Sequence, residues 1–132
     1  MDSRSFPYTL LVGRALLALV FLASGVGKLL AWDSTAGYMG FRGIPWPHAF
    51  LTAAVVLEIG GSLSLLLGWK ARCGAIMLAI MLVPATIIFH NFWAVPEDQQ
   101  REQLLQFLKN VSIFGGLLLV MHHAALGMRN VK

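Results

Sequence analysis

Four long apolar segments, joined by more polar stretches, dominate the sequence. They cover residues 9–30, 49–69, 73–93 and 104–125. Each is close to the length of about 20 mostly apolar residues that a helix needs to cross a bilayer. None alternates apolar and polar positions as the strands of a membrane barrel do, and a helix satisfies its own backbone polar groups in lipid. The pattern therefore predicts an all-α fold, an integral membrane bundle of four spanning helices.

The stretches between these segments differ in character. Residues 31–48 contain three glycines and a Pro-Trp-Pro sequence, so we expect a long loop there. Residues 68–72 predict a tight turn, and residues 96–103 predict a polar connection rich in Glu and Gln. Four tryptophans lie at or beside the predicted span ends, as in an interfacial aromatic belt: Trp32, Trp46, Trp69 and Trp93.

The composition supports a membrane protein. Of the 132 residues, 58% are hydrophobic and 12% are charged, and the mean hydropathy is +0.72. A soluble domain carries about 25% charged residues, and a soluble fold of this size cannot hide so much apolar surface. These values exclude disorder and indicate a single domain over residues 1–132, with the lipid bilayer as its surroundings.

The basic residues set the expected orientation. The ten Lys and Arg residues are scattered between apolar runs, so the net charge of +4 predicts no nucleic-acid binding. One side of the predicted bundle collects Arg4, Arg14, Lys70, Arg72, Arg129 and Lys132. The other side collects Lys28, Arg42, Arg101 and Lys109. Because cytoplasmic loops carry the excess of positive charge, both termini are predicted to be cytoplasmic.

The first segment has a second reading, as a cleaved signal peptide with small residues at positions 23–25. Arg14 interrupts the apolar stretch that such a peptide needs. We therefore interpret residues 9–30 as an uncleaved span.

The single cysteine limits the chemistry. One thiol, Cys73, cannot form an internal disulfide, a CxxC redox centre or a Cys-rich zinc site. The sequence contains no nucleotide-binding or hydrolase motif of the common kinds. We predict neither a metal site nor an intrinsic cofactor.

Ionisable side chains inside the spans are costly in lipid and are functional candidates. Arg14 and Lys28 are fourteen residues apart, which places them within about 40° of each other on one helix face. Glu58 is the only carboxylate at predicted membrane depth, about 8 Å from Arg14 along the membrane normal. We therefore predict a buried ion pair between Arg14 and Glu58, which either belongs to a site or only fixes the helix register.

A second group of polar residues falls in the outer half of the bilayer. These are Lys28, His90, Lys109 and Asn110, from the first, third and fourth predicted helices. If their faces converge, they form a basic pocket that opens outward. The apolar residues expected below it are Phe21, Phe89 and Phe114. Lys and His donors in such a pocket suit a quinone carbonyl or a small anion. In the alternative reading, the lysines snorkel to the headgroups and the histidine is interfacial.

Short motifs occur in each predicted helix. The first carries Arg14, Leu16-Leu17 and Phe21-Leu-Ala-Ser-Gly-Val-Gly-Lys28-Leu29. The second and the turn after it carry Glu58-Ile-Gly-Gly61, Leu66-Leu-Gly68 and Arg72-Cys-Gly-Ala75. The third ends in Ala85-Thr86 and Phe89-His90-Asn-Phe-Trp93, and the fourth carries Gln106-Phe-Leu-Lys-Asn110 and Gly115-Gly116. In this order the motifs resemble the DoxX family over nearly the whole chain.

The resemblance implies a small four-helix protein of the bacterial inner membrane. The family's name derives from subunits of a thiosulfate:quinone oxidoreductase, and some members are linked to membrane redox complexes. It thus implies a component of a membrane redox system with a quinone as candidate ligand, and with a protein partner or a second copy of the chain. Any catalysis would be that of a subunit of a quinone-linked oxidoreductase. Two alternatives stay open: a non-catalytic scaffold or accessory subunit, and a small-solute carrier.

Overall fold

The computed structural model describes residues 8–129, and every regular element in that range is helical. The elements are α1 (Thr9–Leu30), α2 (Trp32–Phe41), α3 (Pro47–Leu67), α4 (Ala71–Phe89), the short 3-10 helix η2 (Phe92–Ala94) and α5 (Glu97–Arg129). Helices α1, α3, α4 and α5 are long and apolar enough to cross a membrane. The predicted all-helical membrane bundle with four spans is therefore confirmed.

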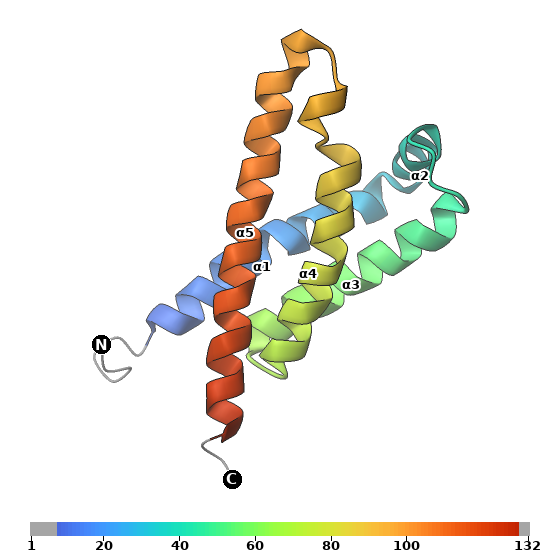
Figure 1. Ribbon diagram of the computed structural model, residues 1–132. Coiled ribbons are helices and arrows are strands. Elements are labelled where there is room, and N and C mark those ends of the chain that lie inside the picture. The colour runs from blue at the N-terminus through green and yellow to red at the C-terminus, as the bar shows by residue number, and fades with distance from the viewer. Residues whose placement is uncertain (1–7, 130–132) are drawn as a thin grey trace.

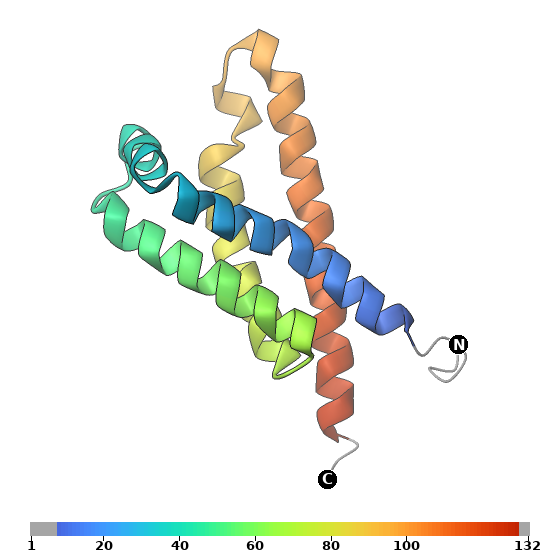
Figure 2. The ribbon, with the colours of Figure 1, turned by 180° about the vertical axis from the view of Figure 1, so that it is seen from behind.

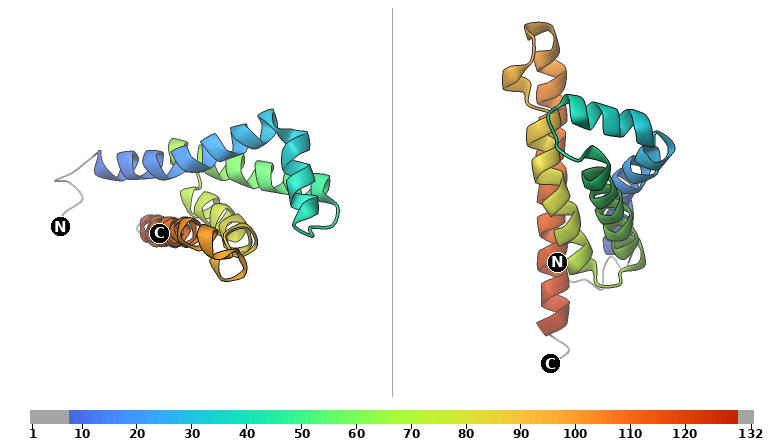
Figure 3. Two further views of the ribbon diagram at one scale, coloured as in Figure 1. Left: turned by 90° about the horizontal axis from the view of Figure 1, so that it is seen from above. Right: turned by 90° about the vertical axis from the view of Figure 1, so that its right-hand side faces the viewer.

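The four long helices form two crossed pairs. Helices α1 and α3 lie side by side, α4 and α5 lie side by side, and the two pairs cross obliquely (Figures 1 and 2). The view from above separates the pairs into two layers (Figure 3). The start of α1, the α3–α4 turn and the end of α5 lie toward one end of the molecule, here called the turn end. Helix α2 and the α4–α5 connection lie toward the other, the α2 end.

The main core lies where the two layers cross. Its fully or nearly buried residues are Ala18, Phe21, Leu65, Ala71, Ala75, Leu78, Ala79, Leu82, Leu117 and Val120. Helices α3 and α4 approach closely because Gly61 and Gly74 face each other. A Cβ atom at either position would lie 3.0 Å from the carbonyl oxygen of the other. Small residues at such crossings let helix backbones pack closely in a membrane.

The expectation of a long loop over residues 31–48 is wrong, because α2 occupies ten of these residues. Glycine costs a helix up to about 1 kcal/mol per residue relative to alanine. Here Ala36 and Met39 are buried against Leu51 and Val55 of α3, and this packing offsets the cost. The loop proper is short and contains Gly43, with φ +86°.

Residues 96–103 are polar, as expected, but the fourth helix starts earlier than the predicted span 104–125, because α5 begins at Glu97. Its 33 residues span about 50 Å, well beyond the hydrocarbon core of about 30 Å. Polar residues mark where the membrane-crossing part of a helix stops, but the helix itself can continue beyond them. Gln103, in this extension, lies 2.9 Å from His90 at the end of α4, and one turn further on the rings of Phe92 and Phe107 are 5.4 Å apart.

Candidate functional site

A buried ion pair joins α1 to α3. Lys28 Nζ donates hydrogen bonds to Glu58 Oε1 at 2.9 Å and Oε2 at 3.0 Å. It also donates to Ser24 Oγ at 2.7 Å, and Ser24 Oγ donates to Glu58 Oε1 at 3.2 Å. The Glu58 side chain is 3% exposed and that of Lys28 is 26% exposed. The carboxylate is thus fully engaged in a closed network of three side chains.

The sequence around Ser24 and Lys28 builds this network through local geometry. The two residues are one helical turn apart, so both side chains point toward the same part of α3. Between them, Gly25 is buried, and a Cβ atom there would lie 2.8 Å from Ile59 Cγ1. The missing side chain lets α1 approach α3 closely enough for Lys28 to reach Glu58.

The predicted ion pair between Arg14 and Glu58 is wrong, since Glu58 pairs with Lys28. Arg14 instead lies at the far end of α3. A Cβ atom placed on Gly68 would meet Arg14 Nη1 at 2.5 Å. Glu58 and Gly68 are ten residues apart, about 15 Å along α3. The depth argument placed the two helices in the wrong register along the membrane normal.

Arg14 therefore occupies the C-terminal end of α3. Gly68 is the C-cap residue of that helix and has a left-handed conformation with φ +68°. The last carbonyl groups of a helix carry a partial negative charge, and a cation there is stabilising. Within residues 8–129, Arg14 Nε is buried with no hydrogen-bond partner.

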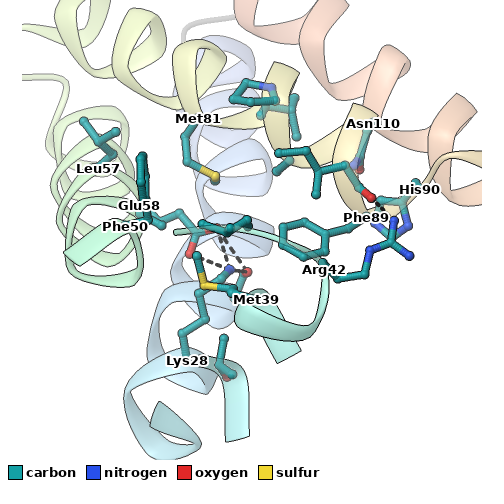
Figure 4. Close-up of a pocket in the computed structure, with 18 of the residues that line it drawn as sticks. Lys28, Met39, Arg42, Phe50, Leu57, Glu58, Met81, Phe89, His90 and Asn110 are labelled. Carbon is teal, nitrogen blue, oxygen red and sulfur yellow. Dashed lines mark hydrogen bonds and ion pairs between the residues drawn. The ribbon is translucent and has the colours of Figure 1, made fainter. Parts of the chain in front are cut away.

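A large cavity opens between the two helix layers, on the α2 side of the core. Its volume is about 1090 Å³, and residues from all five α-helices line it. All four residues predicted to share a pocket, Lys28, His90, Lys109 and Asn110, are among them. Figure 4 shows Lys28 and Glu58 on one side and His90 and Asn110 on the other, with Met39, Met81 and Phe89 between. Whether they bind a ligand together remains a prediction.

The expected apolar floor of the pocket is right in part. Phe21 and Phe89 line the cavity. Phe114 lines a separate small pocket between α4 and α5 of about 190 Å³. Phe114 lies on a face of α5 that points away from the cavity. The sequence does not show how α5 is rotated about its axis, so it could not predict this.

The polar residues at the α4 and α5 side are held by neighbouring groups. His90 Nδ1 lies 2.9 Å from Gln103 Oε1. Asn110 Nδ2 donates to Thr86 Oγ1 at 3.0 Å, and Thr86 Oγ1 donates to the Leu82 carbonyl oxygen at 2.7 Å. Because an amide oxygen only accepts, this contact requires His90 Nδ1 as the donor, and the tautomer with its proton on Nδ1 has Nε2 as an acceptor.

Arg42, at the end of α2, is a lining residue that the sequence analysis did not select. Its guanidinium donates to the Ile88 carbonyl oxygen and, at 2.9 Å, to Asn91 Oδ1. It therefore ties α2 to the end of α4, and Figure 4 shows it beside Phe89 and His90. The sequence placed Arg42 in the predicted 31–48 loop and used it only as one of the basic residues that predict the orientation in the membrane. The signal that would have found it is the helical spacing of Ala36 and Met39, which predicts that this segment packs.

His48 is held outside this site, where its Nδ1 accepts a hydrogen bond of 2.9 Å from Trp32 Nε1. Across the described range, no three His, Cys, Asp or Glu side chains are grouped so that they could hold a metal ion.

Fold and cavity together define a small helical integral membrane protein with a ligand-sized space between its layers. Comparison with known proteins identifies its family. Residues 9–91 match the sequence profile of the DoxX family, and the chain belongs to this family. It is 32% identical over 114 residues to the inner membrane protein YphA of Escherichia coli (strain K12), covering 86% of this chain and 81% of YphA. The inner membrane protein YqjF of the same organism is 33% identical over 110 residues, covering 83% and 79%.

A eukaryotic relative is much longer. The ER-derived vesicles protein ERV29 of Saccharomyces cerevisiae (strain ATCC 204508 / S288c) is 30% identical over 124 residues, which cover 94% of this chain but 33% of ERV29. No solved structure is detectably similar to the chain. With its four spans and these relatives, the chain is a multi-pass inner membrane protein.

Proposed function

We propose that this DoxX protein is a ligand-binding component of a membrane redox system and that its cavity holds a quinone. The observation that carries the proposal is the cavity itself. A volume of about 1090 Å³ is at the upper end of the range of about 300–1,000 Å³ typical of small-molecule sites. Such sites combine apolar walls with a few polar groups. That combination suits a quinone, which has a polar ring and an apolar tail.

The polar groups supply both kinds of hydrogen bond that a quinone and its reduced form need. Carbonyl oxygens of a quinone accept hydrogen bonds, and Lys109 and Arg42 are donors on the cavity wall. The hydroxyl groups of a quinol donate, and His90 Nε2 is an acceptor when Nδ1 is bound to Gln103.

The proposal includes a protein partner that exchanges electrons with the quinone. The chain has one cysteine, Cys73, which is exposed on α4, so it offers no dithiol for this purpose. A partner subunit or a second copy of the chain would complete the system.

The test is a binding measurement on variants that fill the cavity without changing its polar groups. Ala54 and Ala85 line the cavity on α3 and α4, whereas Ala23 is an exposed residue of α1 outside it. The purified chain in phosphatidylcholine nanodiscs is expected to bind a radiolabelled short-tailed ubiquinone analogue. Ala54→Phe and Ala85→Phe should abolish this binding, and the matched control Ala23→Phe should leave it unchanged.

Failure of the wild-type chain to bind the quinone analogue would refute this proposal. The accessory-subunit alternative would then gain support if the chain still co-purifies with a stoichiometric protein partner in mild detergent. Equal loss of binding in Ala23→Phe would show that the effect does not come from the cavity.

A further inference from the structure

The cavity carries more positive than negative charge. Three cationic side chains line it, Lys28, Arg42 and Lys109, against one carboxylate, Glu58. Lys28 and Glu58 neutralise each other through contacts of 2.9 and 3.0 Å. Two positive charges, on Arg42 and Lys109, are therefore left over.

No carboxylate of the described residues balances these two charges. The acceptors of Arg42 are a backbone carbonyl and the side-chain amide of Asn91, both neutral. Within residues 8–129 the only ion pair is that between Lys28 and Glu58. The other described acidic residues, Asp33, Glu97, Asp98 and Glu102, do not line the cavity.

Uncompensated cations at the edge of a membrane interior favour the approach of an anion. Charges interact more strongly where water and counter-ions are scarce, and intramembrane cations pair with an opposite charge or face a polar cavity. Guanidinium and ammonium groups form their strongest hydrogen bonds with carboxylate and phosphate oxygens. Arg42 is half-buried and Lys109 is exposed, and both line the cavity. The part of the cavity that they line is thus suited to an oxyanion.

The rest of the cavity is suited to a hydrocarbon chain. Its apolar wall includes Phe50, Leu57, Ile80, Met81, Phe89 and Ile113. These side chains come from α3, α4 and α5, and they line the same cavity as the cations. An inorganic anion alone would leave this apolar volume unfilled.

We propose that the cavity selects an amphiphile whose head is an oxyanion, a carboxylate or a phosphate, and whose tail is a hydrocarbon chain. The proposal rests on the proposed function in one respect, that the cavity takes up an amphipathic molecule. It differs from that function in the head group, because a quinone head is neutral. An oxyanionic amphiphile would compete with the quinone for the same cavity, with Arg42 and Lys109 as the residues that select its charge.

The experiment compares probes that share a tail or a head. Dodecyl phosphate, dodecanol and inorganic phosphate each compete with the radiolabelled ubiquinone analogue for the purified chain in phosphatidylcholine nanodiscs. Dodecyl phosphate should bind at least about tenfold more tightly than dodecanol, because one charge-assisted hydrogen bond is worth about that factor. It should also bind at least about tenfold more tightly than inorganic phosphate, because the tail buries apolar area.

The variants separate the charge of each cation from its shape. Lys109→Gln and Arg42→Gln should each reduce the preference for dodecyl phosphate over dodecanol about tenfold, whereas Arg42→Lys should retain most of it. Arg101→Gln is the matched control, because Arg101 is an exposed cation on the same helix that does not line the cavity. It should leave the preference unchanged.

The possible failures are distinguishable. Equal competition by dodecanol and dodecyl phosphate would overturn the charged head, and equal competition by inorganic phosphate would overturn the tail. In both cases the quinone analogue would still be bound, so the proposed function would stand. If the quinone analogue does not bind, direct binding of radiolabelled dodecyl phosphate decides between the proposals. Its binding would leave the anionic amphiphile standing while the quinone falls, and its failure to bind would overturn both.

Discussion

Replacing Lys28 with methionine tests the central contact between α1 and α3. Methionine keeps the length of the apolar stem and removes the ammonium group. In the wild type, Lys28 Nζ contacts both oxygens of Glu58. The variant leaves the Glu58 carboxylate, 3% exposed, with the Ser24 hydroxyl as its remaining side-chain donor.

The expected loss of stability follows from this burial. Removing one member of a buried ion pair costs about 3–5 kcal/mol, because the remaining charge is uncompensated. Lys28 is 26% exposed, so water partly solvates the pair and the lower value of about 3 kcal/mol applies. This corresponds to a change of about a hundredfold in the unfolding equilibrium constant.

The two single variants should not be equivalent. Glu58→Gln leaves a partly exposed ammonium group that can still donate to Ser24 and to the new amide oxygen, so its cost should be about 1–2 kcal/mol. The double variant Lys28→Met with Glu58→Gln removes both charges and should recover about 2 kcal/mol relative to Lys28→Met. The coupling between the two positions is therefore expected to be strong.

Reversible unfolding in mixed micelles of decyl maltoside and dodecyl sulfate, followed by circular dichroism, measures these values. Arg101→Met, which removes an exposed cation from α5, is the control and should match the wild type. The reasoning is refuted if Lys28→Met is as stable as the wild type, or if the two single effects simply add in the double variant.

Three further predictions test other contacts, the first two by the same unfolding assay and the third by amide hydrogen exchange. Gly25→Ala places a Cβ 2.8 Å from a side-chain carbon of α3 and should lower the free energy of unfolding by about 1–3 kcal/mol. Gly27→Ala, whose Cβ would have no atom within 4 Å, is the control and should not lower it. Equal losses in the two variants would contradict the close approach of α1 and α3 at Gly25. Gly68→Ala combines φ +68° with a contact to Arg14 and should cost at least about 1–2 kcal/mol. Unchanged stability would contradict the left-handed conformation at this turn. Arg42→Gln should speed amide hydrogen exchange in α2 more than in α3, because it loses charge-assisted bonds to α4; unchanged exchange would show that apolar packing alone holds α2.

Hydropathy could not predict helix α2, because apolar packing against another helix stabilises it. The ten residues of α2 contain two glycines and read as a loop, yet Ala36 and Met39 are buried. Their partners, Leu51 and Val55, lie more than ten residues away in the sequence. A pattern within one segment carries no information about such partners.

The sequence grouped four residues that line one cavity, but it gave the wrong partner for Glu58 and missed Arg42. The grouping of Lys28, His90, Lys109 and Asn110 followed from depth alone, since each lies in the outer half of its span, and the four do line one cavity. Depth could not show that Arg42 lines the same cavity, because the position of Arg42 depends on the fold of α2.

The sequence by itself determined the class of the protein and its four spans, because a backbone in lipid must form its hydrogen bonds internally and the apolar lengths then fix the helices. Tertiary structure alone decided which cation faces Glu58. Arg14 and Lys28 share one face of α1, and either is chemically able to pair with a carboxylate. The close approach at Gly25 sets the antiparallel register that brings Lys28 to Glu58 and leaves Arg14 at Gly68. Such a register depends on interlocking side chains from two helices, and neither helix encodes it alone.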